Sequence, residues 1–255
     1  MLTSPRMIES LLQKCRPRYT SRLQFWVQLL RETQVQRMVE IGVYQGDFAA
    51  AIFEVCDRIE RYYLIDPWRH LPKWNKPFNT DDRDFERIFA IAQRNTDFAG
   101  TRRVILRGTT TEVIDQIADG ELDFAYIDGD HTLRGITIDL VRVYSKIHMG
   151  GLIGGVDFCD SIWYHSSQFE PTLVFPFAVY FAEAVGAAIY ALPNMQFCLY
   201  KPEKPKFQFV DLTGGRFREL SLRNQFAPQK CFKLMLGERF PRLTRIAAKA
   251  KAAFR

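Results

Sequence analysis

The sequence lacks the features that mark several common protein classes. Its five cysteines, Cys15, Cys56, Cys159, Cys198 and Cys231, are widely spaced and form no CxxC pair. This pattern argues against a zinc knuckle or a disulfide framework and favours a reducing compartment. The start of the chain contains no apolar h-region, so no signal peptide is expected. Together these absences predict a cytoplasmic localisation, and no internal repeat is visible.

Long uninterrupted hydrophobic runs are also missing. The longest apolar stretch extends from Val174 to Leu192, and it contains Pro176, Gly186 and a central Glu183. An acidic side chain at the centre of a bilayer costs roughly 2.5–3.5 kcal/mol on insertion scales. We therefore interpret the stretch as a buried helix followed by a strand, not as a membrane span.

The composition suits one sizeable globular core, and its charge is unevenly distributed. Of 255 residues, 47% are hydrophobic and 25% are charged, which excludes a disordered chain. Residues 1–200 carry 21 basic and 25 acidic side chains (net −4), whereas residues 201–255 carry 14 basic and 4 acidic ones (net +10). Apolar and basic residues in 241–255 follow helical spacing. A packed helix, a basic end without structure, and a helix that contacts membranes or anionic glycans all stay open.

Short β-rich runs alternate with longer helical patterns. Strands are expected at 37–41, 61–65, 103–106, 122–127, 152–156, 188–192 and 196–200, and helices at 48–56, 84–98, 110–118, 133–147 and 176–185. The pattern predicts an α/β, Rossmann-like doubly wound sheet of seven strands, mostly parallel with an antiparallel closing strand. We expect an N-terminal helical segment (1–35), a main domain (36–201) with a lid loop at about 68–82, and a basic C-terminal extension (202–255).

Ligands of open α/β sheets bind beyond the carboxyl ends of the strands. The first strand ends in a turn bounded by Gly42 and Gly46, where small residues let backbone approach a ligand closely. The dinucleotide signature GxGxxG is absent, which weighs against a dehydrogenase. Asp66 ends the second strand, at the position where a carboxylate commonly binds ribose hydroxyls. A turn-forming Asp-Pro pair is the ordinary alternative.

The segment IDGDH, residues 127–131, follows the fourth strand and brings Asp128, Asp130 and His131 together. Carboxylates there can orient a ligand or hold a hard cation, and a histidine can accept a proton near neutral pH. Asp157 ends the fifth strand, where it can face Asp128. A satisfied surface histidine is the alternative for His131, and His165 is a second candidate base.

Four loop aromatics, Trp68, Trp74, Phe78 and Trp163, lie near the expected site. Aromatic faces stack on sugars or planar acceptors, and ordinary packing of the lid explains these residues equally well.

Together the motifs EIGVYQG, LIDPW, LDFAYIDGDH and GGLIGG with its following aspartate resemble class I S-adenosylmethionine-dependent methyltransferases over about residues 36–200. More narrowly, they resemble the macrocin and mycinamicin sugar O-methyltransferases. The resemblance implies S-adenosyl-L-methionine as cofactor. It assigns cofactor binding to Glu40, Gly42, Tyr44, Gly46, Asp66, Gly108, Thr109 and Asp128, catalysis to His131 with Asp128, and a Mg²⁺ ion to Asp128 and Asp157.

One departure concerns the metal. Members of this group commonly carry two adjacent ligands after the fifth strand, and here that pair is Val156-Asp157. One ligand is therefore missing, and the requirement for Mg²⁺ stays open because magnesium keeps several waters and needs few carboxylates.

The resemblance implies an O-methyltransferase that acts on a hydroxyl of a sugar, glycan or other small hydroxylated metabolite. One alternative is an RNA or other nucleic-acid methyltransferase that uses the basic tail. Against it, no NPPY-type motif follows the fourth strand. Another is a non-catalytic S-adenosylmethionine-binding protein, which Val156 suggests. A homo-oligomer and peripheral membrane contact through the tail stay open, and nucleic acid is the less expected partner.

Overall fold

The computed structural model describes residues 4–15, 21–165, 168–217, 223 and 225–240. The helices are α1 (Pro5–Cys15), α2 (Arg22–Thr33), α3 (Asp47–Val55), α4 (Asp82–Thr96), α5 (Thr110–Val113), α6 (Leu133–Lys146), α7 (Val174–Val185) and α8 (Pro228–Arg239), with short 3₁₀ segments η2 (Asp97–Arg102) and η3 (Ile114–Gln116). The strands are β1 (Arg37–Ile41), β2 (Arg61–Asp66), β3 (Arg103–Arg107), β4 (Leu122–Ile127), β5 (Ile147–Gly155), β6 (Ala188–Leu192), β7 (Gln196–Tyr200) and β8 (Gln208–Asp211).

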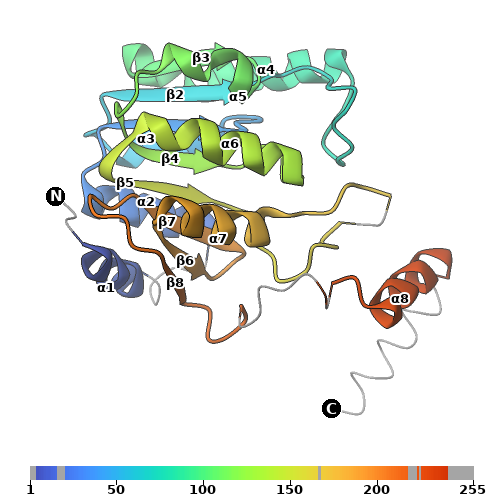
Figure 1. The fold of residues 1–255 in the computed structure, drawn as a ribbon. Helices are drawn as coiled ribbons and strands as arrows, with labels where there is room; N and C mark the ends of the chain where they lie inside the picture. The colour runs from blue at the N-terminus through green and yellow to red at the C-terminus, as the bar shows by residue number, and fades with distance from the viewer. Residues whose placement is uncertain (1–3, 16–20, 166–167, 218–222, 224, 241–255) are drawn as a thin grey trace.

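The strands form one sheet in the order β3-β2-β1-β4-β5-β7-β6-β8 (Figure 1). Strand β7 runs antiparallel to its neighbours β5 and β6, and the other neighbouring strands pair in parallel. The chain starts at β1, moves outward to β3, and returns to the other side of β1 with β4. This reversal creates a switch point at the carboxyl ends of β1 and β4, where doubly wound folds bind ligands. The predicted fold class is confirmed.

The sheet has eight strands, so the prediction of seven was wrong. The additional strand β8 pairs in parallel with β6, with Ala188 opposite Gln208 and Ala191 opposite Asp211. Its four residues are too few to show a clear periodic pattern, and they lie in the segment predicted as a basic extension. Helix α8 also lies in this segment, and the amphipathic helix predicted at 241–255 falls outside the described residues.

The other predicted elements are present, with ends shifted by one to a few residues. The apolar stretch from Val174 to Leu192 forms α7 and β6, as expected. In the part of the chain that the structure describes, no helix is long and apolar enough to cross a membrane. The segment predicted as a lid forms a loop up to α4, whose first turn is capped by the Asp81 carboxylate.

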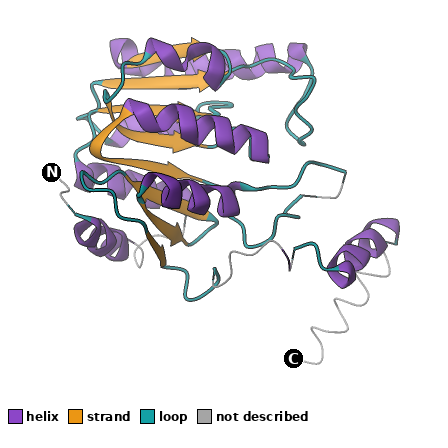
Figure 2. Cartoon of the chain, in the orientation of Figure 1, coloured by secondary structure: helices purple, strands orange, loops and turns teal. Residues whose placement is uncertain are grey.

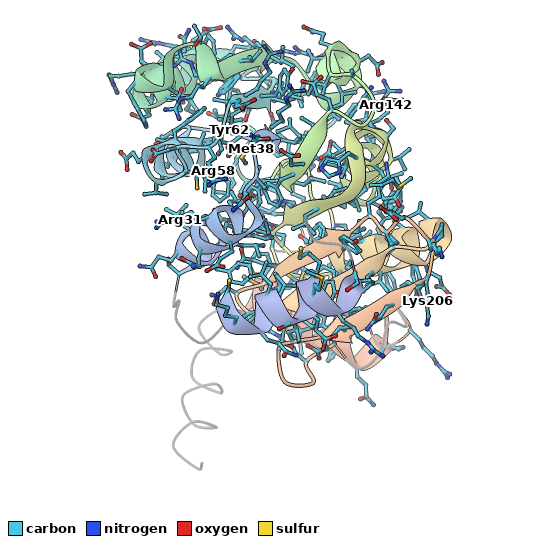
Figure 3. The ribbon with its side chains drawn as sticks, turned by 90° about the vertical axis from the view of Figure 1, so that its left-hand side faces the viewer. Arg31, Met38, Arg58, Tyr62, Arg142 and Lys206 are labelled. Carbon is cyan, nitrogen blue, oxygen red and sulfur yellow. The ribbon has the colours of Figure 1, made fainter. Side chains whose placement is uncertain are left out.

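Helices cover both faces of the sheet (Figure 2). The alternation of side chains along β4 explains why: Phe124 and Tyr126 join the core beneath α1–α4, whereas Ala125 and Ile127 join the core beneath α5–α7. In Figure 3, Arg31 of α2 and Arg142 of α6 lie on opposite sides of the molecule. The sheet is therefore buried on both faces, as parallel sheets generally are.

Trp26 anchors α2 to this sheet. Its side chain is fully buried, and its ring lies 5.4 Å from Phe124 and 5.5 Å from Tyr126 between centroids. The indole Nε1 donates to the side-chain oxygen of Gln196. A Cβ atom at Gly154 would lie 2.3 Å from the indole ring, so the glycine makes the space that Trp26 fills. The position of α2 relative to β4 and β5 is thereby fixed.

We expect Trp26→Ala to lower the free energy of unfolding by about 3–5 kcal/mol, because it removes a large buried side chain and leaves a cavity. Urea denaturation followed by circular dichroism measures this. Val141→Ala on α6, where the side chain is 52% exposed, is the control and should change stability by less than about 0.5 kcal/mol. Equal losses in the two variants would show that α2 is not anchored by this side chain.

Candidate active site

The carboxyl ends of β1, β2, β4 and β5 meet at one edge of the sheet, and the loops that follow them lie beyond the arrowheads in Figure 1. Most of the side chains that the sequence singled out are carried by these ends. They converge because β1, β2, β4 and β5 run in parallel.

The turn after β1 packs directly against the loop after β4. Gly42 has a φ of +85°, and a Cβ atom there would lie 2.1 Å from the carbonyl oxygen of Asp128. The Asp128 amide in turn donates to the carbonyl of Ile41 at 2.8 Å. Gly46, with a φ of +78°, is the N-cap residue of α3. Glycine is therefore required at position 42 by both conformation and space.

The Asp66 carboxylate holds the same turn from the other side. One oxygen accepts the amides of Val43 and Tyr44 at 3.0 and 2.9 Å, and the other accepts the amide of Trp68 at 2.8 Å. Burial raises the pKa of Asp66, although the amide hydrogen bonds act in the opposite direction. A carboxylate offers about four acceptor positions. Asp66 therefore fixes the turn and keeps capacity for one further donor.

Glu40 lies inside the protein, beneath this turn. Only 2% of the residue is exposed, and the Tyr62 hydroxyl donates to its carboxyl group at 2.7 Å. Burial raises the pKa of Glu40 well above its ordinary value. In this structure Glu40 is thus a buried, hydrogen-bonded acid that packs under the turn after β1.

Gly108 and Thr109 follow β3 and adjoin Asp66 through the backbone. The Gly108 amide donates to the Asp66 carbonyl at 3.0 Å. A Cβ atom at Gly108 would lie 2.5 Å from a methyl group of Val113, so glycine lets α5 pack closely. Thr109 caps α5 in a reciprocal arrangement with Glu112.

His131 lies between two carboxylates. Its Nδ1 is 2.8 Å from an oxygen of Asp157, and its Nε2 is 3.5 Å from an oxygen of Asp128. Because a carboxylate can only accept, neutral His131 carries its proton on Nδ1 and leaves Nε2 unprotonated. Nε2 is buried and has no hydrogen-bond partner among the described residues.

The two acids shift the charge state of His131. Burial alone lowers the pKa of the imidazole, but the hydrogen bond and the charge of Asp157, with a smaller contribution from Asp128, raise it overall. Burial acts to raise the pKa of Asp157, but the hydrogen bond and charge of His131, together with the charges of His165 and Lys76, lower it overall. His165, the second candidate base, lies farther away, with Nε2 3.9 Å from Asp157.

Asp128 has a second cationic neighbour, which the sequence did not point to. Arg22, the first residue of α2, places a guanidinium nitrogen 3.0 Å from Asp128. Burial raises the pKa of Asp128 to about 6, against the opposing charges of His131 and Arg22. The negative charge of Asp128 is therefore flanked by His131 on one side and by the guanidinium of Arg22 on the other.

The predicted lid is tied to the site by a buried lysine and a tryptophan. Lys76 is 6% exposed, and its ammonium donates to the carbonyl of Glu170 at 2.9 Å and to the Thr172 hydroxyl at 3.2 Å. The indole of Trp74 donates to Asp130 at 3.0 Å. Trp68, in contrast, is 1% exposed, so it packs in the core and is not available to stack on an acceptor.

The donor set does not suit a divalent cation. Asp128 and Asp157 are both oriented toward His131, and Arg22 takes the remaining oxygen of Asp128. Val156, at the usual position of a further ligand, is 3% exposed and belongs to the hydrophobic core. Within the described ranges, no group of three or more His, Cys, Asp or Glu side chains is arranged to hold a metal. The residues present therefore do not fit the Mg²⁺ ion that the resemblance implies.

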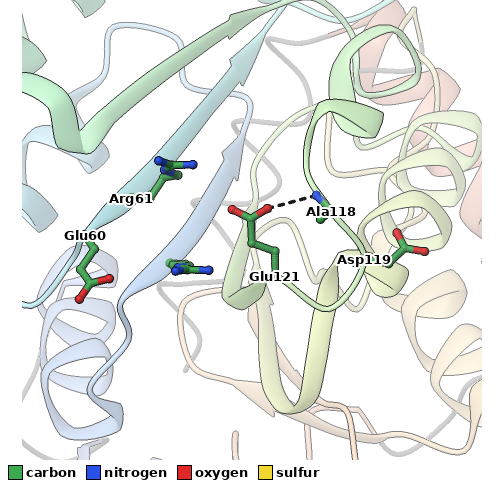
Figure 4. A pocket seen from close by; sticks show the side chains of 6 residues that line it. Glu60, Arg61, Ala118, Asp119 and Glu121 are labelled. Carbon is green, nitrogen blue, oxygen red and sulfur yellow. Dashed lines mark hydrogen bonds between the residues drawn. The ribbon is translucent and has the colours of Figure 1, made fainter.

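A cavity of about 470 Å³ lies at the opposite edge of the sheet (Figure 4). Glu121 lines it and is engaged within the protein, because it accepts the Ala118 amide at 3.1 Å and the Tyr63 hydroxyl at 2.6 Å. The cavity is next to the amino ends of β1 and β2, where Arg37 and Arg61 begin these strands, so it is not part of the site.

Comparisons with known proteins agree with this geometry. Residues 39–158 match the model of a family described as a methyltransferase domain. No curated protein sequence matches the chain.

Solved structures resemble the chain at low sequence identity. The cofactor-bound Rv0187 protein from MTB has a TM-score of 0.53 at 16% identity, over 79% of this chain and 91% of that one. A proposed caffeoyl-CoA O-methyltransferase from Staphylococcus aureus has a TM-score of 0.53 at 16% identity, over 76% of this chain and 89% of that one. The SAH-bound Podospora anserina methyltransferase PaMTH1 has a TM-score of 0.51 at 15% identity, over 78% of this chain and 89% of that one. These likenesses show the fold, and the domain match shows the class of enzyme. Residues 39–158 therefore form a methyltransferase domain, and the chain has the fold of class I methyltransferases.

We expect Gly42→Ala to lower the free energy of unfolding by about 2–5 kcal/mol, which combines the cost of a left-handed alanine with that of overpacking. Gly120→Ala is the matched control: its φ is +70°, and nothing lies within 4 Å of its Cβ position. That variant should lose only about 1–2 kcal/mol, the conformational part. Chemical denaturation of both variants measures the difference. Equal losses would mean that the turn and the Asp128 loop can move apart without cost.

Proposed function

Because residues 39–158 form a methyltransferase domain, we propose that the protein transfers a methyl group from S-adenosylmethionine to a hydroxyl oxygen of a small acceptor, such as a sugar. The observation that carries the proposal is the His131–Asp157 pair: the hydrogen bond at Nδ1 leaves Nε2 of the neutral imidazole free to accept a proton at the carboxyl edge of the sheet. A positioned base of this kind is what methylation of an alcohol requires.

The cofactor site is proposed at the turn after β1 and the end of β2. The bound cofactor supplies a methyl group activated on a sulfonium. Gly42 and Gly46 expose backbone in the turn, and Asp66 keeps an acceptor position for a ribose hydroxyl. Gly108 and Thr109, joined to Asp66 through the backbone, are proposed to border the adenine.

His131 is proposed to remove the proton of the acceptor. The bound cofactor would supply the methyl group, which would pass to the acceptor oxygen while the carbon–sulfur electron pair stays on sulfur. The hydroxyl proton moves to Nε2 of His131. Asp157 stabilises the resulting imidazolium, since it already accepts the Nδ1 proton at 2.8 Å.

A second cavity, between the turn after β1 and α4, offers room for part of a small acceptor. It has a volume of about 330 Å³ and adjoins the proposed cofactor turn through Tyr44. Tyr44 meets Phe78 edge to face at 5.9 Å, and Asp84 and Arg87 also line the cavity. Aromatic faces and paired charges are the groups that bind the apolar faces and hydroxyls of sugars.

We expect Asp66→Ala to weaken S-adenosylmethionine binding by about 1–3 kcal/mol, because the ribose hydroxyls and the amides of Val43, Tyr44 and Trp68 lose their acceptor. Calorimetry measures the affinity. Asp123→Ala is the matched control, because Asp123 accepts the amides of Gln36 and Arg37, each at 2.8 Å, at the opposite edge of the sheet. It should cost stability without changing affinity. Similar affinities in the two variants would remove Asp66 from the cofactor site.

We expect His131→Ala to lower kcat by about 10²–10⁴-fold while cofactor affinity is retained, since the residue acts in the transition state. His148→Ala is the control, because His148 also pairs with an aspartate, Asp123, at 3.0 Å, but at the other edge. A near-normal rate for His131→Ala would move the base elsewhere, with His165 the next candidate.

The pH profile gives a further check on the base. Neutral imidazole is the active form, so kcat should rise with pH through a pKa above the ordinary value of about 6.5. Asp157→Asn removes the charge that raises the pKa of His131, and the rise should therefore move to lower pH. An unchanged inflection would assign the profile to another group.

A further inference from the structure

Arg22 belongs to a part of the chain that precedes the matched domain. Helix α2 ends at Thr33, whereas the family match begins at residue 39. The helix nevertheless reaches the site, because buried Trp26 fixes it against the sheet four residues after Arg22. The guanidinium pairs with Asp128 at 3.0 Å. One charge at the site therefore comes from a segment outside the domain itself.

The charges around His131 are balanced by groups of the chain. Asp128 and Asp157 flank the imidazole, and Arg22 meets Asp128 on its other side. Buried carboxylates are costly unless cations compensate them. In other sites built from neighbouring carboxylates, a divalent cation supplies that compensation. Here His131 and Arg22 lie against the two oxygens of Asp128, which a cation would need.

We propose that the guanidinium of Arg22 takes the place of a divalent cation on Asp128 and makes methyl transfer independent of metal. The inference rests on the proposed function, and it makes Arg22 a positioning residue. It holds Asp128 beside Nε2 of His131 and supplies a fixed positive charge near the acceptor hydroxyl. Positive charge and hydrogen bonding both favour the deprotonated form of a hydroxyl.

The chemistry of arginine suits this role. Its charge is permanent, and its planar group has several donors, so one nitrogen can hold Asp128 while others remain for the acceptor. The Arg22 side chain is 46% exposed, which leaves part of the guanidinium accessible from outside. Lysine, a compact point charge, reproduces the charge and not the geometry.

The first test measures metal binding and needs no acceptor. Mn²⁺ is titrated into the full-length protein and followed by electron paramagnetic resonance. We expect the wild type to show no site that depends on Asp128. Arg22→Ala should gain a weak site, which Asp128→Asn in the same background removes. A wild-type site that Asp128→Asn abolishes would overturn the proposal, and so would an Arg22→Ala protein that gains none.

The second test uses turnover. We expect full activity in the presence of a chelator. Arg22→Ala should lower kcat at least about tenfold, as loss of a preorganised charge does. The KM for S-adenosylmethionine should stay nearly constant, and Arg22→Lys should recover part of the rate. Arg31→Ala, on the same helix, is the matched control for charge and should leave turnover unchanged.

Two results separate this inference from the function on which it rests. If no variant and no wild-type preparation binds S-adenosylmethionine, the proposed function fails, whatever the manganese titration shows. If binding and turnover are normal but a chelator abolishes activity, the function stands and the role of Arg22 is wrong. A rise in the KM for S-adenosylmethionine with unchanged kcat in Arg22→Ala would also overturn it, because Arg22 would then be a cofactor ligand.

Discussion

The contact between the turn after β1 and the loop after β4 determines the rest of the site. Gly42 can approach the Asp128 carbonyl only because it has no side chain, and the Asp128 amide is bonded to Ile41. This contact brings the proposed cofactor turn next to the segment that carries His131. The Asp66 carboxylate fixes the other side of the turn. Backbone geometry thus places the proposed methyl donor and the proposed base at one edge of the sheet.

The electrostatics follow from that proximity. Packing two strand ends closely buries Asp128, and burial favours the neutral form of an acid. Two groups that can carry positive charge, His131 and Arg22, lie on either side of Asp128, and Asp157 stabilises the protonated form of His131. When the imidazole of His131 is neutral, the hydrogen bond to Asp157 keeps its proton on Nδ1, and Nε2 is left to accept a proton. The ion pairs that balance the buried charges therefore also position His131 for its proposed role as base.

Features that depend on neighbouring residues could be predicted from the sequence. A buried strand followed by Gly42, Asp66 or Asp128 is a local signal, and parallel strands bring such ends together without further information. Prediction failed where tertiary contacts determine the conformation or the burial of a residue. Strand β8 is short and depends on pairing with β6, so its own residues carried too weak a pattern. Trp68 lies in a loop segment but packs in the core against Phe89, with ring centroids 4.8 Å apart.

Arg22 shows why the charge of a site is harder to predict than its acids. It is 106 residues from Asp128 in sequence, and nothing near it marks it as functional. Its role depends on Trp26, whose burial requires the glycine at position 154 on a distant strand. A carboxylate at a strand end can be located from its own segment, whereas its cation can come from any element that packs nearby. The N-terminal helices, predicted as a separate segment, therefore contribute to the chemistry proposed for the domain, and removing them would expose Asp128 without its guanidinium.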